Sequence, residues 1–280
     1  MAPEGTVQGG FGIGLGPRAG SAFAVGASLL VLTGAGPVDA APRQAPECRP
    51  APTRTEEITT LGPRGELVLG SGARAVLSGV HWPEDAAASW AAADWLLMHR
   101  GRRLTVTGRG DPDRWGHIRI DAAPDDEATN LAGGLIAAGL AATDAGEGDT
   151  LCRPALLALE RAARGVGRGI WRAGAPDVRD GAALREAAGR FIVAEGRLVG
   201  VGERPGRTYL DFVARGRDGL TVTVSKRTWR RLQERGLSAA TLKGRLVRVR
   251  GVVEVGRGPI LDIASADMIE VLDEERAPRR

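Results

Sequence analysis

Two stretches of the sequence repeat one order of elements: three short strands, a helix and then two strands. In the first stretch, the alternating runs EEITTL, ELVLG and ARAVLSGV (residues 56–80) are separated by Gly-Pro and Gly-Ser-Gly turns. A helix over 86–100 follows, and RRLTVTGRG (102–110) and WGHIRIDA (115–122) predict two more strands. Most of these strands are short and bounded by turns, which predicts a small Greek-key barrel interrupted by a helix.

The second stretch returns to strands after residue 190. Residues 191–226 contain three alternating runs, 226–237 predict one helix, and 242–272 predict two strands and a terminal one. This is the element order of an OB-type barrel. We therefore predict a mainly β protein with helices (α+β), in which one OB-fold barrel with accessory helices is followed by a second OB-like barrel.

The predicted helices each have a recognisable pattern. The helix over 86–100 is expected to present one apolar face, formed by Trp90, Trp95, Leu97 and Met98. A short helix lies within 127–143 and runs into Gly139. The helix over 154–171 is amphipathic, and it places Glu160 and Arg164 at the i,i+4 spacing of an ion pair.

The first forty residues differ in kind from the rest. Arg18 precedes an uncharged run of small and apolar residues (19–36), and Val38-Asp39-Ala40 offers small residues at positions −3 and −1 of a cleavage site. This pattern predicts a cleaved secretory signal and hence a periplasmic or secreted protein. The alternative is an uncleaved N-terminal membrane anchor, for which the run barely reaches the roughly 18 residues that are needed.

Both cysteines, Cys48 and Cys152, follow the predicted signal. An even number of cysteines in an exported protein favours a disulfide, which would tie the N-terminal tail to the body. Two unrelated thiols are the alternative. Neither the spacing nor the neighbouring residues suggest a metal site.

Four motifs that follow one another carry a resemblance to a known family. ARAVLSGVHWPE, DRWGHIRI, EATNLAGGLIAAGLA and LLALERAARGVGRGIW resemble, in order and spacing, motifs of the thermonuclease (staphylococcal nuclease-like) family. The resemblance covers about residues 58–173. Residues 190–272, with YLDF, GPILDI and IEVL, resemble the OB-like module that follows such domains in bacterial relatives.

The sequence patterns and the resemblance together divide the chain into six parts. They are a signal peptide or anchor (1–40), a linker (41–57), a thermonuclease-like OB-fold domain (58–173), a connector (174–189), an OB-like basic module (190–273) and a charged tail (274–280).

The resemblance also implies which residues would carry chemistry. Family enzymes hold Ca²⁺ with aspartates, use a glutamate on the attacking water, and bind the phosphate with two arginines, because phosphodiester hydrolysis builds negative charge on the phosphoryl oxygens. The glutamate falls on Glu84. The metal-binding aspartate falls on His81, and the two arginines fall on Val76 and His117.

Near two of the family's catalytic positions, this sequence offers one substitute arginine and lacks one acidic residue. Arg74 lies two residues before Val76, on the same face of the strand. The turn aspartate that the family has near Pro63 has no acidic counterpart. The catalytic set is thus largely degenerate, and an inactive protein would need no cofactor.

The alternative is a divergent phosphodiesterase that uses Glu84 with His81 and His117, with His81 as a metal ligand. It would require Ca²⁺ or a transition metal, although neutral imidazole is a poor ligand for Ca²⁺. Glu84 has a simpler explanation as a carboxylate in the first turn of the helix that follows. Trp115, in a turn of the same cleft, either packs or stacks on bases.

Positive charge concentrates in the C-terminal third. Residues 189–280 contain 19 Lys and Arg against 12 Asp and Glu. Within the basic runs SKRTWRRLQER and KGRLVRVRG, a nucleic-acid groove would use Arg227, Arg230, Lys243, Arg245, Arg248 and Arg250. The alternative is that these residues lie on a solvated barrel exterior. In the first barrel, Arg74 and Trp115 are the residues predicted to bind nucleic acid.

Three hypotheses for the function follow from these observations. The first is an exported pseudoenzyme, a nuclease homologue that binds nucleic acid or another anionic polymer. The second is the divergent metal-dependent phosphodiesterase. The third is a structural envelope protein that binds a protein partner.

Overall fold

The structure, a computed structural model, describes residues 45–146, 148 and 150–273. The predicted signal or anchor (1–40) and the charged tail (274–280) lie outside these residues. The described residues belong to one compact unit, and two barrels lie within it.

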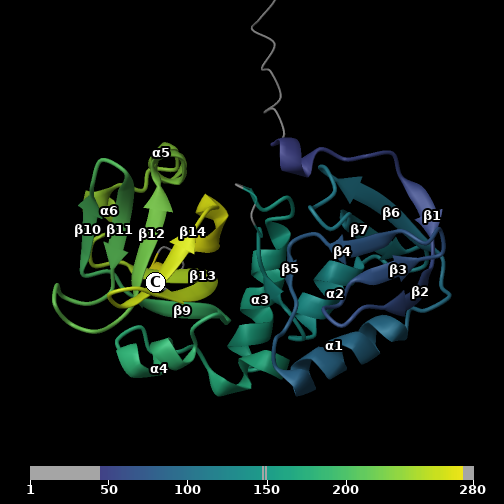
Figure 1. Cartoon of the computed structure of the whole chain (residues 1–280), viewed down its shortest axis with the longest axis horizontal. Helices are drawn as coiled ribbons and strands as arrows, with labels where there is room; N and C mark the ends of the chain where they lie inside the picture. The colour runs from purple at the N-terminus through teal and green to yellow at the C-terminus, as the bar shows by residue number, and fades with distance from the viewer. Residues whose placement is uncertain (1–44, 147, 149, 274–280) are drawn as a thin grey trace, which may run out of the picture. The chain divides into compact units, whose positions relative to one another are not determined.

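The first barrel is a sheet with the strand order β1-β6-β7-β4-β3-β2 (Figure 1). Its strands are β1 (Arg54–Glu56), β2 (Ile58–Leu61), β3 (Leu67–Leu69), β4 (Arg74–Leu77), β6 (Leu104–Arg109) and β7 (Ile118–Pro124). β1 lies within residues 41–57, which were predicted to be a linker, so the barrel begins earlier than expected. Only Glu57 separates β1 from β2, so the two are halves of one bent strand. Because β1 pairs with β6 and β2 pairs with β3, the bend closes the sheet into a barrel.

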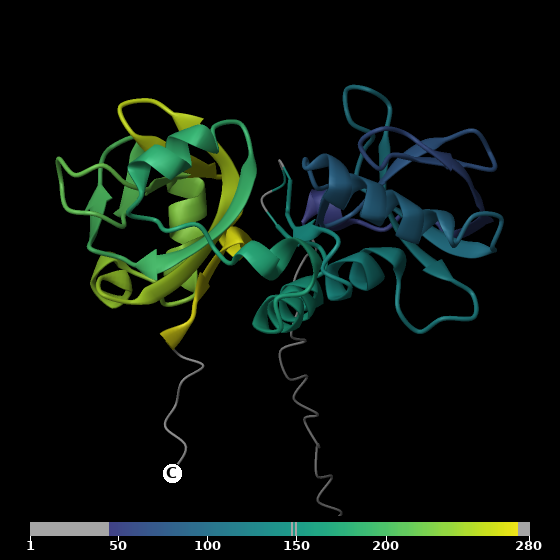
Figure 2. The ribbon, with the colours of Figure 1, turned by 90° about the horizontal axis from the view of Figure 1, so that it is seen from below.

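The second barrel is closed in the same way (Figure 2). Its strands are β9 (Phe191–Arg197), β10 (Gly200–Glu203), β11 (Arg207–Asp211), β12 (Thr221–Ser225), β13 (Leu246–Val255), β14 (Pro259–Ile263) and β15 (Ile269–Val271). Only Leu198 and Val199 separate β9 from β10. Since β9 pairs with β13 and β10 pairs with β11, this bent strand also joins the two ends of its sheet.

Each barrel contains one parallel pair of strands, β4 with β7 and β12 with β14. Parallel neighbours need a long crossover connection, which usually holds a helix. The first crossover contains α1 (Ala86–Leu97), and the second contains α5 (Lys226–Glu234) and α6 (Ala239–Leu242). The predicted fold class is therefore confirmed: the chain is mainly β with helices and forms two OB-type barrels in succession.

The buried face of α1 differs from the prediction. Ala92 and Leu96 are fully buried, whereas Trp90, Leu97 and Met98 are exposed and Trp95 is only partly buried. Asp94 is the one charged residue of α1, and the other eleven residues are apolar or small. The sequence pattern therefore does not select one face. The Asp85 side chain caps the helix by accepting a hydrogen bond from the Ala88 amide, which fixes where α1 begins.

The connector predicted at 174–189 is partly a structured element of the second barrel. Asp180 caps a short helix, α4 (Gly181–Glu186), through the Ala183 amide. Val178 and Leu184 are buried in the same core as Phe212 and Trp229. The second core therefore recruits residues that lie before the predicted start at 190.

A buried network of arginines and glutamates joins α3 (Ala155–Gly165) to the second barrel. The side chains of Glu160 on α3 and Arg250 on β13 are both fully buried, and their Oε1 and Nη2 atoms lie 2.9 Å apart. Arg164 on α3 lies 2.7 Å from Glu195 on β9. The predicted Glu160–Arg164 pair within the helix was wrong, because each residue binds a partner on the second barrel.

Two carboxylates of this network have lowered pKa values. Burial on its own raises the pKa of Glu195 and of Glu270, on β15, but arginines outweigh this effect. Arg248 and Arg164 act on Glu195, and Arg250 and Arg248 act on Glu270. Both pKa values therefore lie below the ordinary value for glutamate, so both groups are ionised at neutral pH.

The predicted disulfide joins Cys48 to Cys152, which lie 104 positions apart in the sequence. Cys48 ends a short 3-10 helix (Pro46–Cys48), and Cys152 precedes α3. The bond attaches the segment before β1 to the segment that leads into α3.

The turn between β2 and β3 depends on a glycine. Gly65 has φ +75°, and a Cβ placed there would lie 2.1 Å from the Trp82 ring. Trp82 is held in place by a hydrogen bond of 2.8 Å from its Nε1 to Ser89 Oγ. Any side chain at position 65 would therefore be strained and would also collide with an aromatic ring.

We expect Gly65→Ala to lower the free energy of unfolding by about 2–4 kcal/mol, since it adds an overpacking collision to the strain of a positive φ. Gly72→Ala is the matched control, because Gly72 has φ +82° but open space around it. Urea denaturation should show a much smaller loss for the control. Equal losses would contradict the role of Trp82.

We expect Glu270→Gln to lower the free energy of unfolding at pH 7 by about 3 kcal/mol, because it leaves buried arginines without their counter-charge. A carboxylate with a lowered folded-state pKa stabilises the fold above its unfolded-state pKa, about 4.3, and this contribution is lost as the pH falls through the folded-state pKa. Urea denaturation at pH 7 and at pH 3.5 should show a smaller acid-induced loss for Glu270→Gln than for the unchanged chain. The control is Glu203→Gln, at an exposed position on β10. Its free energy of unfolding should fall between pH 7 and pH 3.5 by as much as that of the unchanged chain.

Candidate nucleic-acid interface

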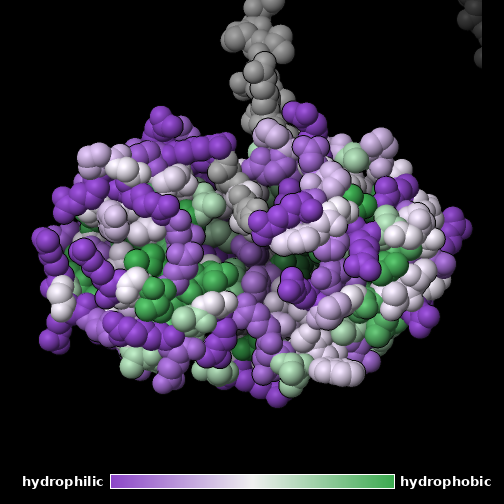
Figure 3. Space-filling model, viewed as in Figure 1, coloured by the Kyte–Doolittle hydropathy of each residue, from purple (hydrophilic) through white to green (hydrophobic). Residues whose placement is uncertain are grey.

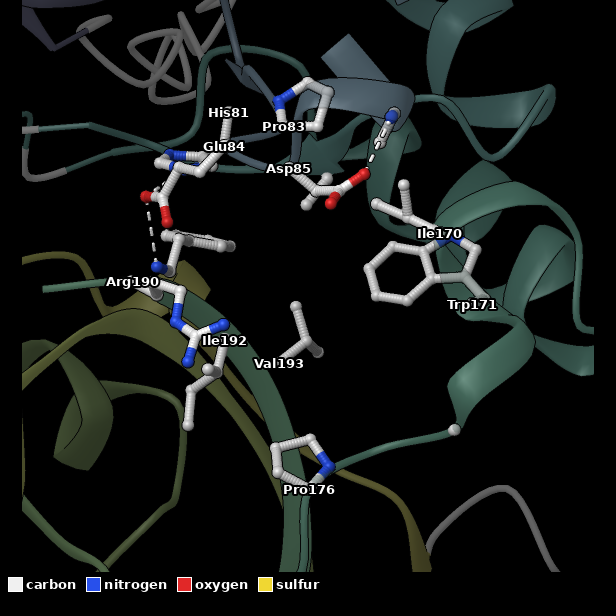
Figure 4. Close-up of a pocket in the computed structure, with 14 residues that line it drawn as sticks. His81, Pro83, Glu84, Asp85, Ile170, Trp171, Pro176, Arg190, Ile192 and Val193 are labelled. Carbon is white, nitrogen blue, oxygen red and sulfur yellow. Dashed lines mark hydrogen bonds and ion pairs between the residues drawn. The ribbon is translucent and has the colours of Figure 1, made fainter. Parts of the chain in front are cut away.

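The stretch SGVHWPED connects the first barrel to the second. β5 (Val80–His81) pairs with β8 (Ala142–Thr143), and Pro83 and Glu84 lead into α1. The His81 ring stacks on Phe191 with the ring centroids 4.0 Å apart and an interplanar angle of 15°. Glu84 Oε1 accepts a hydrogen bond of 3.3 Å from the Phe191 amide (Figure 4).

Two carboxylates flank the His81 ring. Nε2 lies 3.4 Å from Glu84 Oε1, and Nδ1 lies 3.7 Å from Asp144 Oδ2. A cavity of about 380 Å³ adjoins this group, and Figure 4 shows residues of both barrels around it. Its walls include Trp171, Arg190, Ile192 and Val193. His81 and Glu84 therefore serve as contacts between the barrels, and Phe191, which the sequence analysis missed, is their common partner.

His117 lies in a different place from His81 and Glu84. It lines a cleft of about 740 Å³ in the first barrel, which neither of those two residues lines. Its Nδ1 lies 3.1 Å from Asp113 Oδ2. The site predicted for a divergent phosphodiesterase, made of His81, Glu84 and His117, is therefore not assembled.

The residues present do not fit the Ca²⁺ that the family resemblance implies. Ca²⁺ prefers several oxygen ligands, whereas the position of the metal-binding aspartate holds the His81 imidazole, stacked on Phe191. In residues 45–146, 148 and 150–273, no three His, Cys, Asp or Glu side chains are grouped so that they could hold a metal ion. We therefore derive no catalytic step through a metal.

The cleft that contains His117 combines aromatic, basic and acidic side chains. Its lining residues are Thr60, Leu61, Gly62, Pro63, Arg64, Glu66, Val68, Arg74, Val76, Asp113, Trp115 and His117. Trp115 is 62% exposed. The guanidinium carbon of Arg114 lies 4.1 Å from the centroid of its ring. The cleft thus offers a flat apolar surface with positive charge beside it.

The turn that presents Trp115 is organised by Asp113. One Asp113 oxygen accepts hydrogen bonds of 2.9 Å from the amides of Trp115 and His117. Partial burial raises the pKa of Asp113, but these amides and the His117 ring lower it more, so its pKa lies below the ordinary value. The carboxylate is therefore ionised at neutral pH, and its hydrogen bonds stabilise the turn.

The predicted basic groove of the second barrel is corrected by the structure. Arg248 and Arg250 are buried, and they bind Glu195, Glu160 and Glu270 instead of facing solvent. Strand alternation places both on one face, as expected, but α3 covers that face. They are therefore unavailable to phosphate groups in a nucleic-acid groove.

The other predicted basic residues are distributed over two places. Arg227 and Arg230 lie exposed on α5. Lys243 is exposed at the end of α6, and Arg245 lies 3.5 Å from Asp273. None of these residues lines the cleft at Trp115. In the first barrel, by contrast, Arg74 and Trp115 do line one cleft.

Sequence reasoning missed two arginines near the cleft: Arg64, which lines it, and Arg114, which lies over the Trp115 ring. Arg114 immediately precedes Trp115 in a turn, and this adjacency was the available signal. Arg64 lies in the Gly-Pro-Arg-Gly turn between β2 and β3, and only the folded barrel shows that this turn reaches the cleft.

Hydrophilic residues cover much of the face shown in Figure 3, with hydrophobic residues in smaller groups among them.

None of the helices in the described part of the chain has the length and the apolar character needed to span a membrane.

Comparisons with known proteins show similarity to solved structures only, and the one described below is distant. No protein-family model matches the chain, and no curated protein matches it. Among solved structures, the extended Tudor domain of Drosophila melanogaster Tudor-SN (p100) is similar, with 16% identity and a TM-score of 0.32. The match covers 35% of this chain and 47% of that one, so it spans less than half of the matched structure. The OB-type assignment rests on the strand topology, and membership of the thermonuclease family stays a prediction.

We expect His81 and Phe191 to be energetically coupled. A double-mutant cycle of His81→Ala and Phe191→Ala, measured by urea denaturation, should give a coupling free energy of about 0.5–1.5 kcal/mol, as for stacked aromatic pairs. A second cycle of Trp90→Ala with Phe191→Ala should give additive effects, because Trp90 is exposed on α1. Additivity in the first cycle would contradict the assignment of His81 to the contact between the barrels.

Proposed function

We propose that the first barrel binds single-stranded nucleic acid without hydrolysing it. The observation that carries the proposal is the exposed Trp115 ring with Arg114 over it, at the edge of a cleft that Arg64 and Arg74 also line. Nucleic-acid bases stack on exposed aromatic side chains, and neighbouring guanidinium groups contact the phosphates. Base stacking tolerates any sequence, so the proposal concerns single strands in general.

Binding without cleavage is supported by what the former catalytic positions now do. Glu84 contacts the Phe191 amide, and His81 stacks on the same residue. His117 is engaged with Asp113 in another cavity. A general base, a metal ligand and a phosphate-binding cation are therefore not directed at one substrate atom, as phosphodiester hydrolysis requires. Binding of this kind requires no cofactor.

We further propose that the protein acts outside the cytoplasm, in the periplasm or as a secreted protein. The signal-like sequence of residues 1–40 supports this location. The Cys48–Cys152 disulfide also supports it, because disulfides persist in oxidising compartments.

We expect Trp115→Ala to weaken the binding of a single-stranded oligonucleotide by about 1–3 kcal/mol, the usual contribution of one stacked base. Fluorescence anisotropy with a labelled oligonucleotide measures the change. Trp90→Ala is the matched control, since Trp90 is 78% exposed but lies outside the cleft. Arg74→Ala should weaken binding and reduce the slope of log affinity against log salt concentration by about 1.

The same samples test for cleavage. Oligonucleotides of DNA and RNA are incubated with the full chain in Ca²⁺, Mn²⁺, Zn²⁺ or EDTA, and the products are separated on a denaturing gel. We expect intact oligonucleotide in every case. Metal-dependent cleavage that Glu84→Gln abolishes would overturn the non-catalytic proposal in favour of the phosphodiesterase. Equal affinity of the unchanged chain and Trp115→Ala for the oligonucleotide would instead overturn the proposed binding site. If the unchanged chain binds no oligonucleotide, the nucleic-acid proposal is wrong and a protein partner becomes the hypothesis to test.

A further inference from the structure

A cavity of about 360 Å³ adjoins α3 and is separate from the Trp115 cleft. Its lining residues are Arg161, Arg164, Gly165, Trp171, Gly174, Ala175, Glu195 and Arg248. Three guanidinium groups and a single carboxylate therefore face one small space. The residues come from α3, β9, β13 and the segment after α3, so the cavity lies where the first barrel's last helix meets the second barrel.

The carboxylate of Glu195 is shared between two of the three cations. Its Oε1 accepts a hydrogen bond of 2.7 Å from Arg164 Nη2 and another of 2.9 Å from Arg248 Nε. The side chains of Arg164 and Arg248 are only 10% and 8% exposed. Water therefore has little access to either guanidinium group, and one carboxylate oxygen serves both.

Arg164 keeps an unused donor in this environment. Its Nε is buried, and within the described part of the chain it has no hydrogen-bond partner. A buried donor on a charged group that lacks an acceptor costs more than a neutral one. The guanidinium carbon lies 4.7 Å from the centroid of the Trp171 ring, and this contact keeps the Arg164 plane in place.

The second carboxylate of the region lies behind the lining and does not fill the space. Glu270 binds Arg161, Arg248 and Arg250, but it is not among the residues that face the cavity. The cavity surface itself therefore carries more positive than negative charge. Several guanidinium groups around one small space match the geometry of a tetrahedral oxyanion, whose oxygens accept paired N–H bonds.

We propose that this cavity binds a phosphate group, as inorganic phosphate or as part of a small phosphomonoester. The volume is at the small end of the range for ligand sites and suits a phosphate with a compact substituent. The bound anion would accept hydrogen bonds from guanidinium N–H groups on the cavity wall and offset the positive charge of the lining. The proposal goes beyond the proposed nucleic-acid binding and uses none of its residues.

The test uses the full chain and titrates inorganic phosphate by isothermal calorimetry, with ionic strength held constant by KCl. We expect saturable binding and a rise in the melting temperature that saturates with it, because a ligand that binds only the folded state stabilises it. A parallel titration with methyl phosphate identifies the source: similar affinity indicates free phosphate, and tighter binding indicates a phosphomonoester. Acetate at the same ionic strength should give neither effect.

Variants locate the site. Arg164→Gln should weaken phosphate binding at least tenfold, while Arg168→Gln, which alters an exposed arginine bound to the Ala137 carbonyl, should change it less than twofold. If circular dichroism shows that Arg164→Gln is unfolded, Arg161→Gln, at a side chain that is 42% exposed, takes its place. Trp115→Ala should retain phosphate binding, which separates this site from the nucleic-acid cleft.

Two results would overturn the proposal. One is phosphate that binds no more tightly than acetate at equal ionic strength. The other is unchanged phosphate affinity in the folded Arg164→Gln or Arg161→Gln chain.

Discussion

The buried contact between Glu160 and Arg250 is the contact on which the packing of α3 against the second barrel depends. Neither side chain is exposed at all, and a buried charge without its partner is strongly destabilising. The pair therefore specifies which face of the second barrel receives α3. Glu160 also accepts a hydrogen bond of 2.6 Å from the Thr143 amide, and Thr143 pairs with Val80 in the neighbouring strand. One ion pair thus positions the strand that carries His81.

This arrangement gives His81 and Glu84 of SGVHWPED a structural role in the contact between the barrels. Glu84 and His81 meet Phe191, the first residue of the second barrel's bent strand. A carboxylate that accepts a backbone hydrogen bond and an imidazole that stacks on a ring are both useful in a contact between two barrels. The same residue types would be needed for acid-base chemistry, so their presence in the sequence does not distinguish the two roles.

The order of elements was predictable because it depends on local patterns. Alternating runs, Gly-rich turns and the helices in the crossovers led to two barrels, and the structure has them. The buried face of α1 was not predictable, since almost every residue of that helix is small or apolar and only contact with the barrel selects Ala92 and Leu96.

The site was predictable where the family resemblance brought two motifs of the first barrel to one cleft. Arg74 and Trp115 were assigned to it from two motifs that resemble the thermonuclease pattern, and both line the cleft. The burial of Arg248 and Arg250 depends on glutamates 20 to 90 positions away. Alternation along a strand predicts that two arginines share a face, but it does not say whether a helix covers that face.

The Cys48–Cys152 disulfide makes the first barrel a covalent ring. All of its strands from β1 to β8 lie between the two cysteines, whereas α3 and the second barrel follow Cys152. A mechanical load applied between the chain ahead of Cys48 and the second barrel would pass through the sulfur atoms and bypass these strands. The proposed nucleic-acid cleft would then remain folded under tension, and a single backbone cut within the ring would not release either fragment.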